Sequence, residues 1–502
     1  MSKMFPINGV MIDMVRLTER LEYYQRLIDQ CADWGLNAIL LHFTDDQGCA
    51  MKFESHPKLA SRYALSKNQM AELVARADRR GVTLIPEIES FGHTSYVTER
   101  AGYRHLADGP GGRFGFTAIC PLHRETLALF GDLYREAAEV FSTSPYIHIG
   151  CDEVNFGHSV HSRKLLDRMP RHAVFGQYVA ALVKLVRRTG KEAIIWGDHL
   201  LHDERIADYI DRKVIVHDWR YDPPLPPGQV TAVAKMGYRV IGGPGLMWYN
   251  YRLRCPTAAW KVLDEYIKRL GRLAADQRLG MINTVWVPTR YTSGAMWPAL
   301  AVHAKRMAGK TRGKALREFV AEFWGVRSAE LAQAVDRADR LAPSCSFMKL
   351  LWTNPSELAE AIWNFEPYSR QAEPIEALLK VFKSHRPRVR SNRDDYDSYV
   401  LTLEIQAHGI RRTADVIAAL SASARRAETI LQRIADSDRR LLDRVYDDWA
   451  AARHPDDPRK TAEDAKLEID QMIAPTMTEA AKFSKRLPAL WPKLKDDLKT
   501  RA

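Results

Sequence analysis

The chain has 502 residues, of which 46% are hydrophobic and 27% charged, so it is long enough to bury a large core. Its formal net charge is +12, but no segment alternates aromatic and basic residues as a nucleic-acid platform does. No apolar run reaches the roughly 18 residues of a membrane helix, so we expect neither nucleic-acid nor membrane partners. The N-terminal segment lacks the features of a signal peptide and the cysteines form no C-x-x-C pair, which predicts a cytoplasmic protein.

Short apolar, β-branched runs recur up to about residue 290 and alternate with longer amphipathic stretches. This alternation predicts parallel strands joined by right-handed helical crossovers. Eight such units predict an α/β fold, a (β/α)8 TIM barrel, with a doubly wound open sheet as the alternative. The eight runs are Gly9–Ile12, Asn37–Phe43, Val82–Ile88, Tyr146–Ile149, Ala193–Trp196, Val214–His217, Arg239–Ile241 and Met281–Trp286, and the clearest helical patterns are Leu21–Trp34, Lys67–Arg80, Thr126–Phe141 and Phe175–Thr189.

Polar and aromatic side chains follow these runs, at the point where each strand is expected to end. In a barrel, the carboxyl ends of all strands open on one face, where active sites lie. We therefore predict a functional site there. The residues are Arg16, Asp45, Asp46, Glu87, Glu89, His93, Asp152, Glu153, Trp196, Asp198, Asp218, Trp219, Trp248, Tyr249, Tyr251 and Trp286.

Beyond about residue 330 the pattern becomes helical, with charged segments that carry apolar residues at helical spacing. We therefore predict two domains, a catalytic barrel over residues 1–330 and a mostly α-helical C-terminal domain over residues 331–502. The C-terminal helices either pack on the barrel or bind a partner, including a second copy in a homodimer. The helical segments are Ser356–Phe365, Ser398–Leu420 and Ser421–Asp448, and a proline-containing break from His454 to Pro458 precedes a final helical stretch.

The fourth run, Tyr146-Ile-His-Ile-Gly-Cys-Asp-Glu-Val154, leads directly into two adjacent carboxylates. Successive side chains on an extended backbone point to opposite sides. Asp152 and Glu153 would then not flank one glycosidic bond as the acid and nucleophile of a retaining enzyme, which lie about 5–5.5 Å apart. This favours a division of labour, in which one carboxyl meets the leaving oxygen and the other meets another part of the substrate.

The segment His148-Ile-Gly-Cys-Asp152-Glu153 resembles the H-x-G-x-D-E signature of glycoside hydrolase family 20, the β-N-acetylhexosaminidases. The resemblance extends over roughly residues 7–300 and implies a TIM barrel. Other segments match in order, namely Asp13-Met-Val-Arg16, the stretch from Asn37 to Gly48, the stretch from Ile85 to His93, and the tryptophans Trp196, Trp219 and Trp286.

The resemblance implies substrate-assisted catalysis without a cofactor or a metal ion. The 2-acetamido oxygen of the substrate would attack the anomeric carbon, and Glu153 would act as general acid and then as general base. Asp152 would hold the acetamido N–H, and Asp45, or its neighbour Asp46, would support Glu153 through His93. The expected substrate is an amino-sugar oligosaccharide or glycoconjugate with a terminal β-linked N-acetylglucosamine or N-acetylgalactosamine.

The same resemblance implies a set of sugar-binding side chains. Tyr249 would bond the acetamido group, with Tyr251 as the alternative, and the tryptophans would enclose the sugar. The predicted substrate-binding residues are Arg16, His148, Trp196, Trp219, Tyr249 and Trp286.

Two positions depart from the family pattern. Pro288 stands where many members carry a glutamate that binds O4 and O6, and Asn250 stands where an aspartate usually follows the pocket tyrosine. The segment Thr284-Val-Trp-Val-Pro-Thr-Arg-Tyr291 is closer to the hexosaminidase D branch. The preference between the gluco and galacto sugars is therefore left open.

Two other functions fit a barrel with these residues. One is a metal-dependent hydrolase with His42, Asp45, His148 and Asp152 as ligands, and the other is a barrel that binds glycans without cleaving them. The histidine pairs His158-x-x-His161 and His199-x-x-His202 have ligand-like spacing but no clear third ligand, so we interpret them as surface residues.

Overall fold

The structure is a computed structural model that describes residues 5–109, 118–454 and 473–499. The chain forms two compact units. The first comprises the chain up to Leu246, Ala258–Trp286 and His303–Gly309, and the second comprises Met247–Thr257, Val287–Val302 and the chain from Lys310 onward. Most of the break predicted at His454–Pro458 lies outside the described residues.

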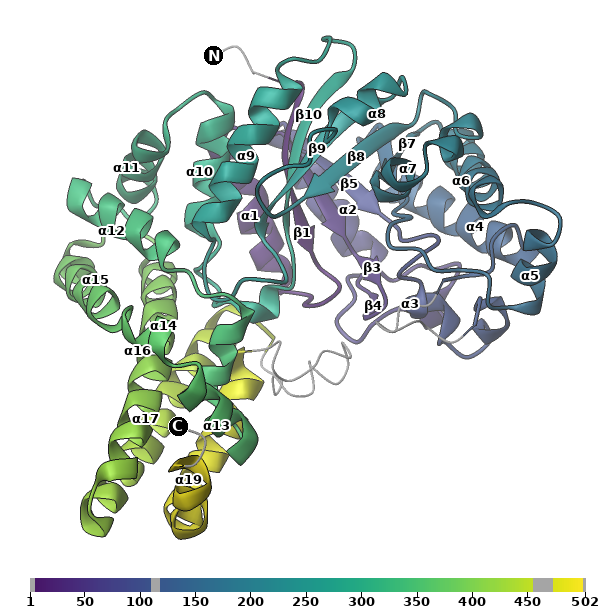
Figure 1. Ribbon diagram of the computed structural model, residues 1–502. Coiled ribbons are helices and arrows are strands. Elements are labelled where there is room, and N and C mark those ends of the chain that lie inside the picture. Colours follow the sequence, from purple (N-terminus) through teal and green to yellow (C-terminus); the bar gives the residue numbers. More distant parts are fainter. Residues whose placement is uncertain (1–4, 110–117, 455–472, 500–502) are drawn as a thin grey trace. The chain divides into compact units, whose positions relative to one another are not determined.

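The first unit is built on a closed barrel of eight strands in the order β1-β10-β9-β8-β7-β6-β5-β2 (Figure 1). Closure is visible at Gly9 of β1, which pairs in parallel with Ala38 on one side and Ile282 on the other. The predicted TIM barrel is confirmed, and the open sheet is wrong because an open sheet leaves two unpaired edges. The strands are β1 (Ile7–Asp13), β2 (Ala38–His42), β5 (Thr83–Glu87), β6 (Tyr146–His148), β7 (Glu192–Trp196), β8 (Ile215–Arg220), β9 (Arg239–Met247) and β10 (Arg278–Val285).

Amphipathic helices follow the strands, and each buries one face. In α1 (Leu21–Trp34) the buried residues Tyr24, Leu27, Ile28, Cys31 and Trp34 recur at helical spacing, and the helix ends at the left-handed Gly35. The other α-helices described in this unit are α2 (Lys67–Arg79), α3 (Ser95–Thr98), α4 (Arg124–Val140), α5 (Val160–Leu166), α6 (Arg171–Arg188), α7 (Asp198–His202), α8 (Thr231–Lys235) and α9 (Thr257–Leu270), and α10 (Trp297–Met307) contributes its last residues.

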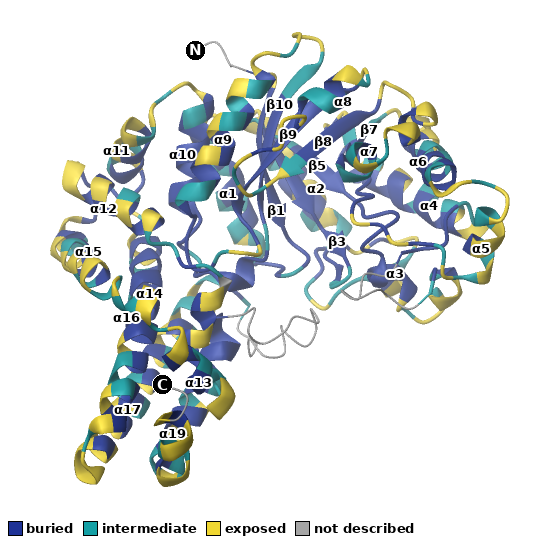
Figure 2. Cartoon of the chain, viewed as in Figure 1, coloured by how far each residue is buried: buried dark blue, intermediate teal, exposed yellow. Residues whose placement is uncertain are grey.

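The interior of the barrel is filled by side chains, as is usual for this architecture. Alternate residues of neighbouring strands supply it, including Ile85, Ile194, Ile215 and Ile282, and all of these are buried. Figure 2 shows the strands in dark blue, while the helices expose their outer faces. A short antiparallel pair, β3 (Thr44–Asp45) and β4 (Gly48–Cys49), follows β2 at the carboxyl end of the barrel.

The second unit is helical, as its sequence predicts. The three longest helices pack in sequence order, α16 against α17 and α17 against α19. Between α16 and α17, the buried carboxylate of Asp438 forms ion pairs with His408 at 2.6 Å and with Arg412 at 3.0 Å. No helix within the described residues is long and apolar enough to cross a membrane. The helices are α11 (Arg312–Glu322), α12 (Ala329–Arg340), α13 (Pro355–Trp363), α14 (Glu366–Ser369), α15 (Ala372–His385), α16 (Arg393–Ser421), α17 (Ala424–Ala452) and α19 (Ile473–Lys499).

Candidate active site

The loop after β6 carries the two adjacent carboxyl groups, and its backbone is not extended. The φ angles of Gly150, Cys151 and Glu153 are 65°, 74° and 48°, in the left-handed region. The expectation that Asp152 and Glu153 point to opposite sides is therefore wrong. A carboxylate oxygen of each lies within 4.8 Å of the other and of a ring nitrogen of His93. Left-handed geometry turns the chain so that both side chains converge.

Glycine at position 150 is required by a close approach as well as by its backbone angle. A Cβ at this position would overlap the carboxyl group of Glu89, which lies directly after β5. Glu89 in turn accepts the backbone N–H of Cys151 at 3.3 Å. The glycine of the motif therefore lets the loop rest on a buried carboxyl group.

His93 lies between Glu153 and the two aspartates that follow β2. Nε2 of His93 lies 3.3 Å from Oε2 of Glu153, and Nδ1 lies 3.2 Å from both Oδ1 of Asp45 and Oδ2 of Asp46. Burial alone would lower the pKa of His93, but the charge of Asp45 and the hydrogen bonds to Asp45 and Asp46 outweigh it and raise the pKa well above 6.5. The ring is therefore an imidazolium, and its hydrogen bond to Glu153 lowers the pKa of that carboxyl.

Asp45 is the centre of this network. Its Oδ2 accepts from Nη2 of Arg16 at 2.7 Å and contacts Nε2 of His42 at 2.8 Å. Burial favours the neutral acid, but the charges of Arg16 and His93 hold the pKa of Asp45 well below 3.8. Asp46 also contacts His93, so both aspartates of the predicted pair reach the relay. Asp45 additionally bonds to Arg16 and His42.

Asp152 has the opposite electrostatic character. It is buried, and burial together with the neighbouring Asp198 and Glu153 raises its pKa to about 8, although His93 works against the shift. Nε2 of His93 lies 3.9 Å from its Oδ2. In the free protein at neutral pH, the proton of the carboxyl pair therefore resides on Asp152, while Glu153, whose side chain is 46% exposed, is ionised.

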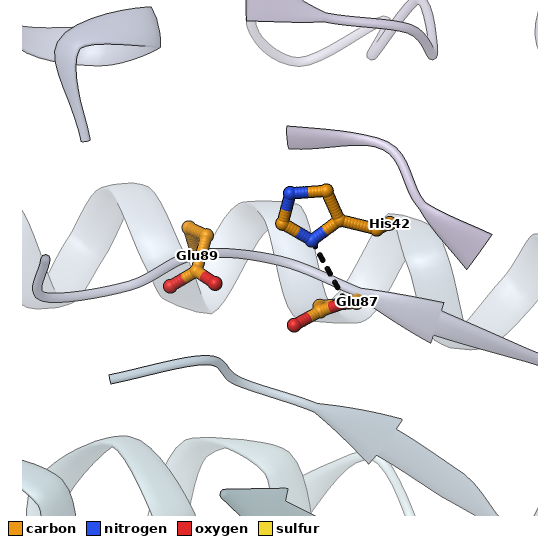
Figure 3. A group of neighbouring side chains, drawn as sticks. All are labelled: His42, Glu87 and Glu89. Atoms are coloured by element: carbon orange, nitrogen blue, oxygen red, sulfur yellow. Dashed lines mark hydrogen bonds and ion pairs between the residues drawn. The ribbon is translucent and has the colours of Figure 1, made fainter. Parts of the chain in front are cut away.

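Beneath this network, His42 and Glu87 form a buried ion pair inside the barrel. Nδ1 of His42 lies 2.9 Å from Oε2 of Glu87, and Glu89 lies beyond them on the stretch after β5 (Figure 3). Burial would lower the pKa of His42, but Glu87 and Asp45 raise it to about 10. His148 is fully buried next to this pair, where its Nδ1 accepts the backbone N–H of Gly150 at 3.1 Å. Its predicted contact with substrate stays a prediction.

Two of the predicted tryptophans lie close together. The rings of Trp196 and Trp286 are 6.3 Å apart, and the guanidinium of Arg16 lies 5.4 Å from the centre of the Trp286 ring. Nε1 of Trp286 donates to the hydroxyl of Tyr221 at 2.8 Å, and Tyr221 packs 5.1 Å from Trp219. Sequence reasoning missed Tyr221, although it follows Trp219 by two residues and is the aromatic residue nearest to that strand end.

Tyr249, the predicted partner of the acetamido group, belongs to the second unit. Its side chain is 55% exposed, and the guanidinium groups of Arg290 and Arg252 lie 4.2 and 5.7 Å from its ring centre. These cations fix the ring from two directions. The role of Tyr249 stays a prediction, whereas Tyr221 lies in the same unit as the carboxyl pair.

The ligand set of the metal hypothesis does not come together. Three groups of described residues are compact enough to hold a cation, and they are His42 with Glu87 and Glu89, Asp45 with Asp46 and His93, and His93 with Asp152 and Glu153. None of these groups joins His42 or Asp45 to His148 and Asp152. Both ring nitrogens of His42 already contact carboxylates, which accounts for its position without an ion.

Comparison with known proteins decides the family. Residues 5–285 match the family model for the catalytic domain of glycosyl hydrolase family 20. This match covers more than half of the chain. The chain belongs to glycosyl hydrolase family 20.

Three relatives share about a quarter of the aligned residues with this chain. It is 25% identical to a β-hexosaminidase of Vibrio furnissii over 284 residues, which are 49% of this chain and 44% of that protein. It is 25% identical to a chitooligosaccharidolytic β-N-acetylglucosaminidase of Ostrinia furnacalis, covering 60% of this chain and 57% of that protein. The chain thus spans about half the length of these two relatives. Hexosaminidase D of Homo sapiens is 27% identical over 414 residues, 75% of this chain and 83% of that protein, as the last barrel motif leads one to expect.

Solved structures of the family share the fold. A chitobiase of Flavobacterium johnsoniae aligns with a TM-score of 0.51 at 16% identity, over 86% of this chain and 75% of that one. A β-N-acetylhexosaminidase aligns with a TM-score of 0.53 at 19% identity, over 64% of this chain and 78% of that one. At these identities the likeness concerns the fold alone.

Proposed function

We propose that this family 20 enzyme is a retaining exo-β-N-acetylhexosaminidase that removes terminal β-linked N-acetylglucosamine or N-acetylgalactosamine. The observation that carries the proposal is the convergence of Asp152 and Glu153 on His93, with the ionised Asp45 behind it. This arrangement places Glu153, which is hydrogen-bonded to His93, beside Asp152. The pKa of Glu153 is lowered and that of Asp152 is raised. The presence of both carboxyl groups favours an enzyme over the glycan-binding alternative.

The reaction proceeds in two steps. The 2-acetamido oxygen of the substrate attacks the anomeric carbon, the glycosidic C–O bond breaks, and Glu153 gives its proton to the leaving oxygen. Asp152 accepts the acetamido N–H and stabilises the positive charge of the oxazoline intermediate. Water then attacks the anomeric carbon, Glu153 takes a proton from it, and the acetamido group is restored.

Substrate binding must redistribute one proton, because the free protein holds it on Asp152. An acetamido N–H that donates to Asp152 favours the ionised form of that carboxyl and lowers its pKa. His93 faces both carboxyl groups, at 3.9 Å from Asp152 and 3.3 Å from Glu153. The imidazolium can therefore release its proton to Glu153 and recover one from Asp152 without any net gain or loss.

The alternative mechanism is a double displacement in which Asp152 is the nucleophile. The oxygen separation of at most 4.8 Å is close to the roughly 5–5.5 Å of such enzymes, so the distance does not separate the two mechanisms. The family match supports the substrate-assisted route, and a substrate without the 2-acetamido group tests it.

The deciding experiment measures 4-nitrophenol release from the β-N-acetylglucosaminide, the β-N-acetylgalactosaminide and the plain β-glucoside. We expect cleavage of one or both amino sugars, inhibition by an oxazoline-mimicking thiazoline, and no cleavage of the glucoside, which lacks the internal nucleophile. Glu153→Gln should abolish the activity, whereas Glu139→Gln, an exposed glutamate paired with Lys67, should not. Glucoside cleavage without thiazoline inhibition would exclude substrate assistance, and loss of activity with a chelator would favour the metal-dependent alternative.

The substrate is an amino-sugar oligosaccharide or glycoconjugate in this proposal, and the cytoplasm is the proposed location. A homodimer through the C-terminal helices remains part of the proposal as well. Light scattering of the full chain, compared with a chain ending before α16, tests the dimer. Cell fractionation tests the location.

A further inference from the structure

Two side chains at the start of α7 hold the loop that carries the carboxyl pair. The backbone N–H of Glu153 donates to Oδ2 of Asp198 at 3.0 Å, and the backbone N–H of Val154 donates to Nε2 of His199 at 2.8 Å. Both acceptors directly follow β7, so they are fixed to the neighbouring strand of the barrel. The sequence interpretation of His199 as a surface residue is wrong, because its side chain is 22% exposed and packs 4.5 Å from the ring of Phe175.

The loop needs such support because its backbone is strained. Cys151 and Glu153 are non-glycine residues with φ angles of 74° and 48°, and each such residue is disfavoured by sterics between Cβ and the carbonyl oxygen. Conformations of this kind persist only where the surroundings hold them. The two hydrogen bonds act on the peptide groups at and after Glu153, where the chain would otherwise relax.

The chemistry of both acceptors fits this role. Burial lowers the pKa of His199, so its ring is neutral and offers a lone pair at Nε2 to the N–H of Val154. Asp198 is 13% exposed, and within the described residues its second oxygen, Oδ1, is buried without a hydrogen-bond partner. A buried polar oxygen without a partner costs free energy, so stability alone does not account for Asp198 at this position.

Asp198 also affects the pKa of Asp152. Among the groups that raise the pKa of Asp152, burial comes first and Asp198 contributes next, while His93 opposes them. Asp198 thus acts on both members of the pair. It holds the backbone of Glu153 by a hydrogen bond, and it disfavours the ionised form of Asp152 by its charge.

We propose that Asp198, assisted by His199, is a positioning residue that clamps the left-handed peptide of Glu153 and so aims the Glu153 carboxyl at His93 and the leaving oxygen. This role rests on the proposed function of Glu153 as the acid. It does not require Asp198 to touch the substrate. Asp198 follows Trp196, the last residue of β7, by two positions. It therefore lies at the carboxyl end of the barrel, like Asp152 and Glu153.

Two variants separate the hydrogen bond from the charge. Asp198→Asn keeps a side-chain oxygen for the Glu153 N–H and removes the charge, whereas Asp198→Ala removes both. We expect Asp198→Ala to lower kcat by about 10²-fold with little change in KM, because a small misplacement of a reacting group has about this effect. We expect Asp198→Asn to retain most of kcat. The basic limb of the pH profile, where Asp152 loses its proton, should move to lower pH because Asp198 no longer raises the pKa of Asp152. The matched control is Asp203→Ala with Asp203→Asn, since Asp203 also accepts a backbone N–H, that of Arg205.

A second readout does not depend on catalysis. Hydrogen–deuterium exchange of the segment 146–156 should be faster in Asp198→Ala than in the natural protein, and nearly unchanged in Asp198→Asn and in both Asp203 variants. If Asp198→Ala and the natural protein have equal kcat and equal exchange rates, Asp198 does not clamp the loop. The clamp is also overturned if Asp198→Asn loses all of kcat while its pH profile stays unshifted. If Asp198→Ala does not fold, Asp198→Asn decides through its kcat and pH profile. Inactivity of the natural protein on all sugars would refute the proposed function instead, and exchange would still test the clamp.

Discussion

Replacement of His93 by asparagine should raise the pKa of Glu153 and thereby move the acidic limb of the pH profile. Asparagine is the suitable replacement because His93 has a φ of 51°, and asparagine tolerates the left-handed region better than most residues. The shorter side chain keeps a donor near Asp45 but removes the positive charge from the side of Glu153.

The magnitude follows from the distance between the two groups. Nε2 of His93 and Oε2 of Glu153 are 3.3 Å apart. Two unit charges at about 4 Å interact by roughly 1 kcal/mol in water and about 4 kcal/mol at an effective dielectric constant of ~20. Because the Glu153 side chain is 46% exposed, solvent screening places the value between these limits. Removing an interaction of this size raises the pKa of Glu153, so the acidic limb of the pH profile should move to higher pH.

The assay measures kcat/KM for a 4-nitrophenyl amino sugar between pH 3 and 9, with each reaction stopped by alkali before the released 4-nitrophenol is read. The pH dependence of kcat/KM reports the pKa values of groups in the free enzyme. In the natural protein we expect the acidic limb below 4.5, where Glu153 gains its proton, and the basic limb near 8, where Asp152 loses its own. In His93→Asn the acidic limb should move up, and the maximum should fall by about 10²-fold.

The control is His105→Asn, which removes an exposed histidine paired with Glu125 and should leave the profile unchanged. A lower maximum with an unmoved acidic limb would refute the electrostatic reasoning and leave His93 with a purely structural role. A limb that moves to lower pH would contradict the sign of the charge effect. Circular dichroism of each variant confirms that it is folded.

Two further predictions concern stability and the acetamido site. Asp152→Asn should stabilise the protein above about pH 4. Burial raises the pKa of Asp152 in the folded state to about 8. Its contribution to the free energy of unfolding is therefore fully present only below the ordinary pKa of 3.8, and it is lost as pH rises toward 8. The gain in the free energy of unfolding, measured by urea titration, should therefore grow from pH 4 to 8 and then level off, and a constant gain would contradict it. Tyr221→Phe should lower kcat/KM more than Tyr249→Phe, because Tyr221 lies in the same unit as the carboxyl pair. The reverse order would favour Tyr249 as the residue that bonds the acetamido group.

Many charged groups are buried at this end of the barrel, and the proposed mechanism gives them a role. Arg16 and His42 offset the carboxylates of Asp45 and Glu87, so that Asp45 stays ionised next to His93. Such pairs contribute little to net stability, since desolvation cancels most of the attraction. Their arrangement instead separates the pKa values of two adjacent carboxyl groups, which is what an acid and a charge stabiliser need.

The sequence by itself determined the eight strands, the helix α1 from Leu21 to Trp34 and the group of polar residues at the carboxyl strand ends. The strands and the helix follow from hydrophobic periodicity, which is a local property of the sequence. The polar group follows from the position of these residues directly after each predicted strand. The tertiary structure alone decided that Asp152 and Glu153 converge. The left-handed Cys151 and Glu153 turn this loop, and Asp198 and His199, which follow the next strand, accept its backbone N–H groups. It also decided the pKa order of the pair, because burial and the charges of residues distant in sequence set that order, and no local pattern encodes either.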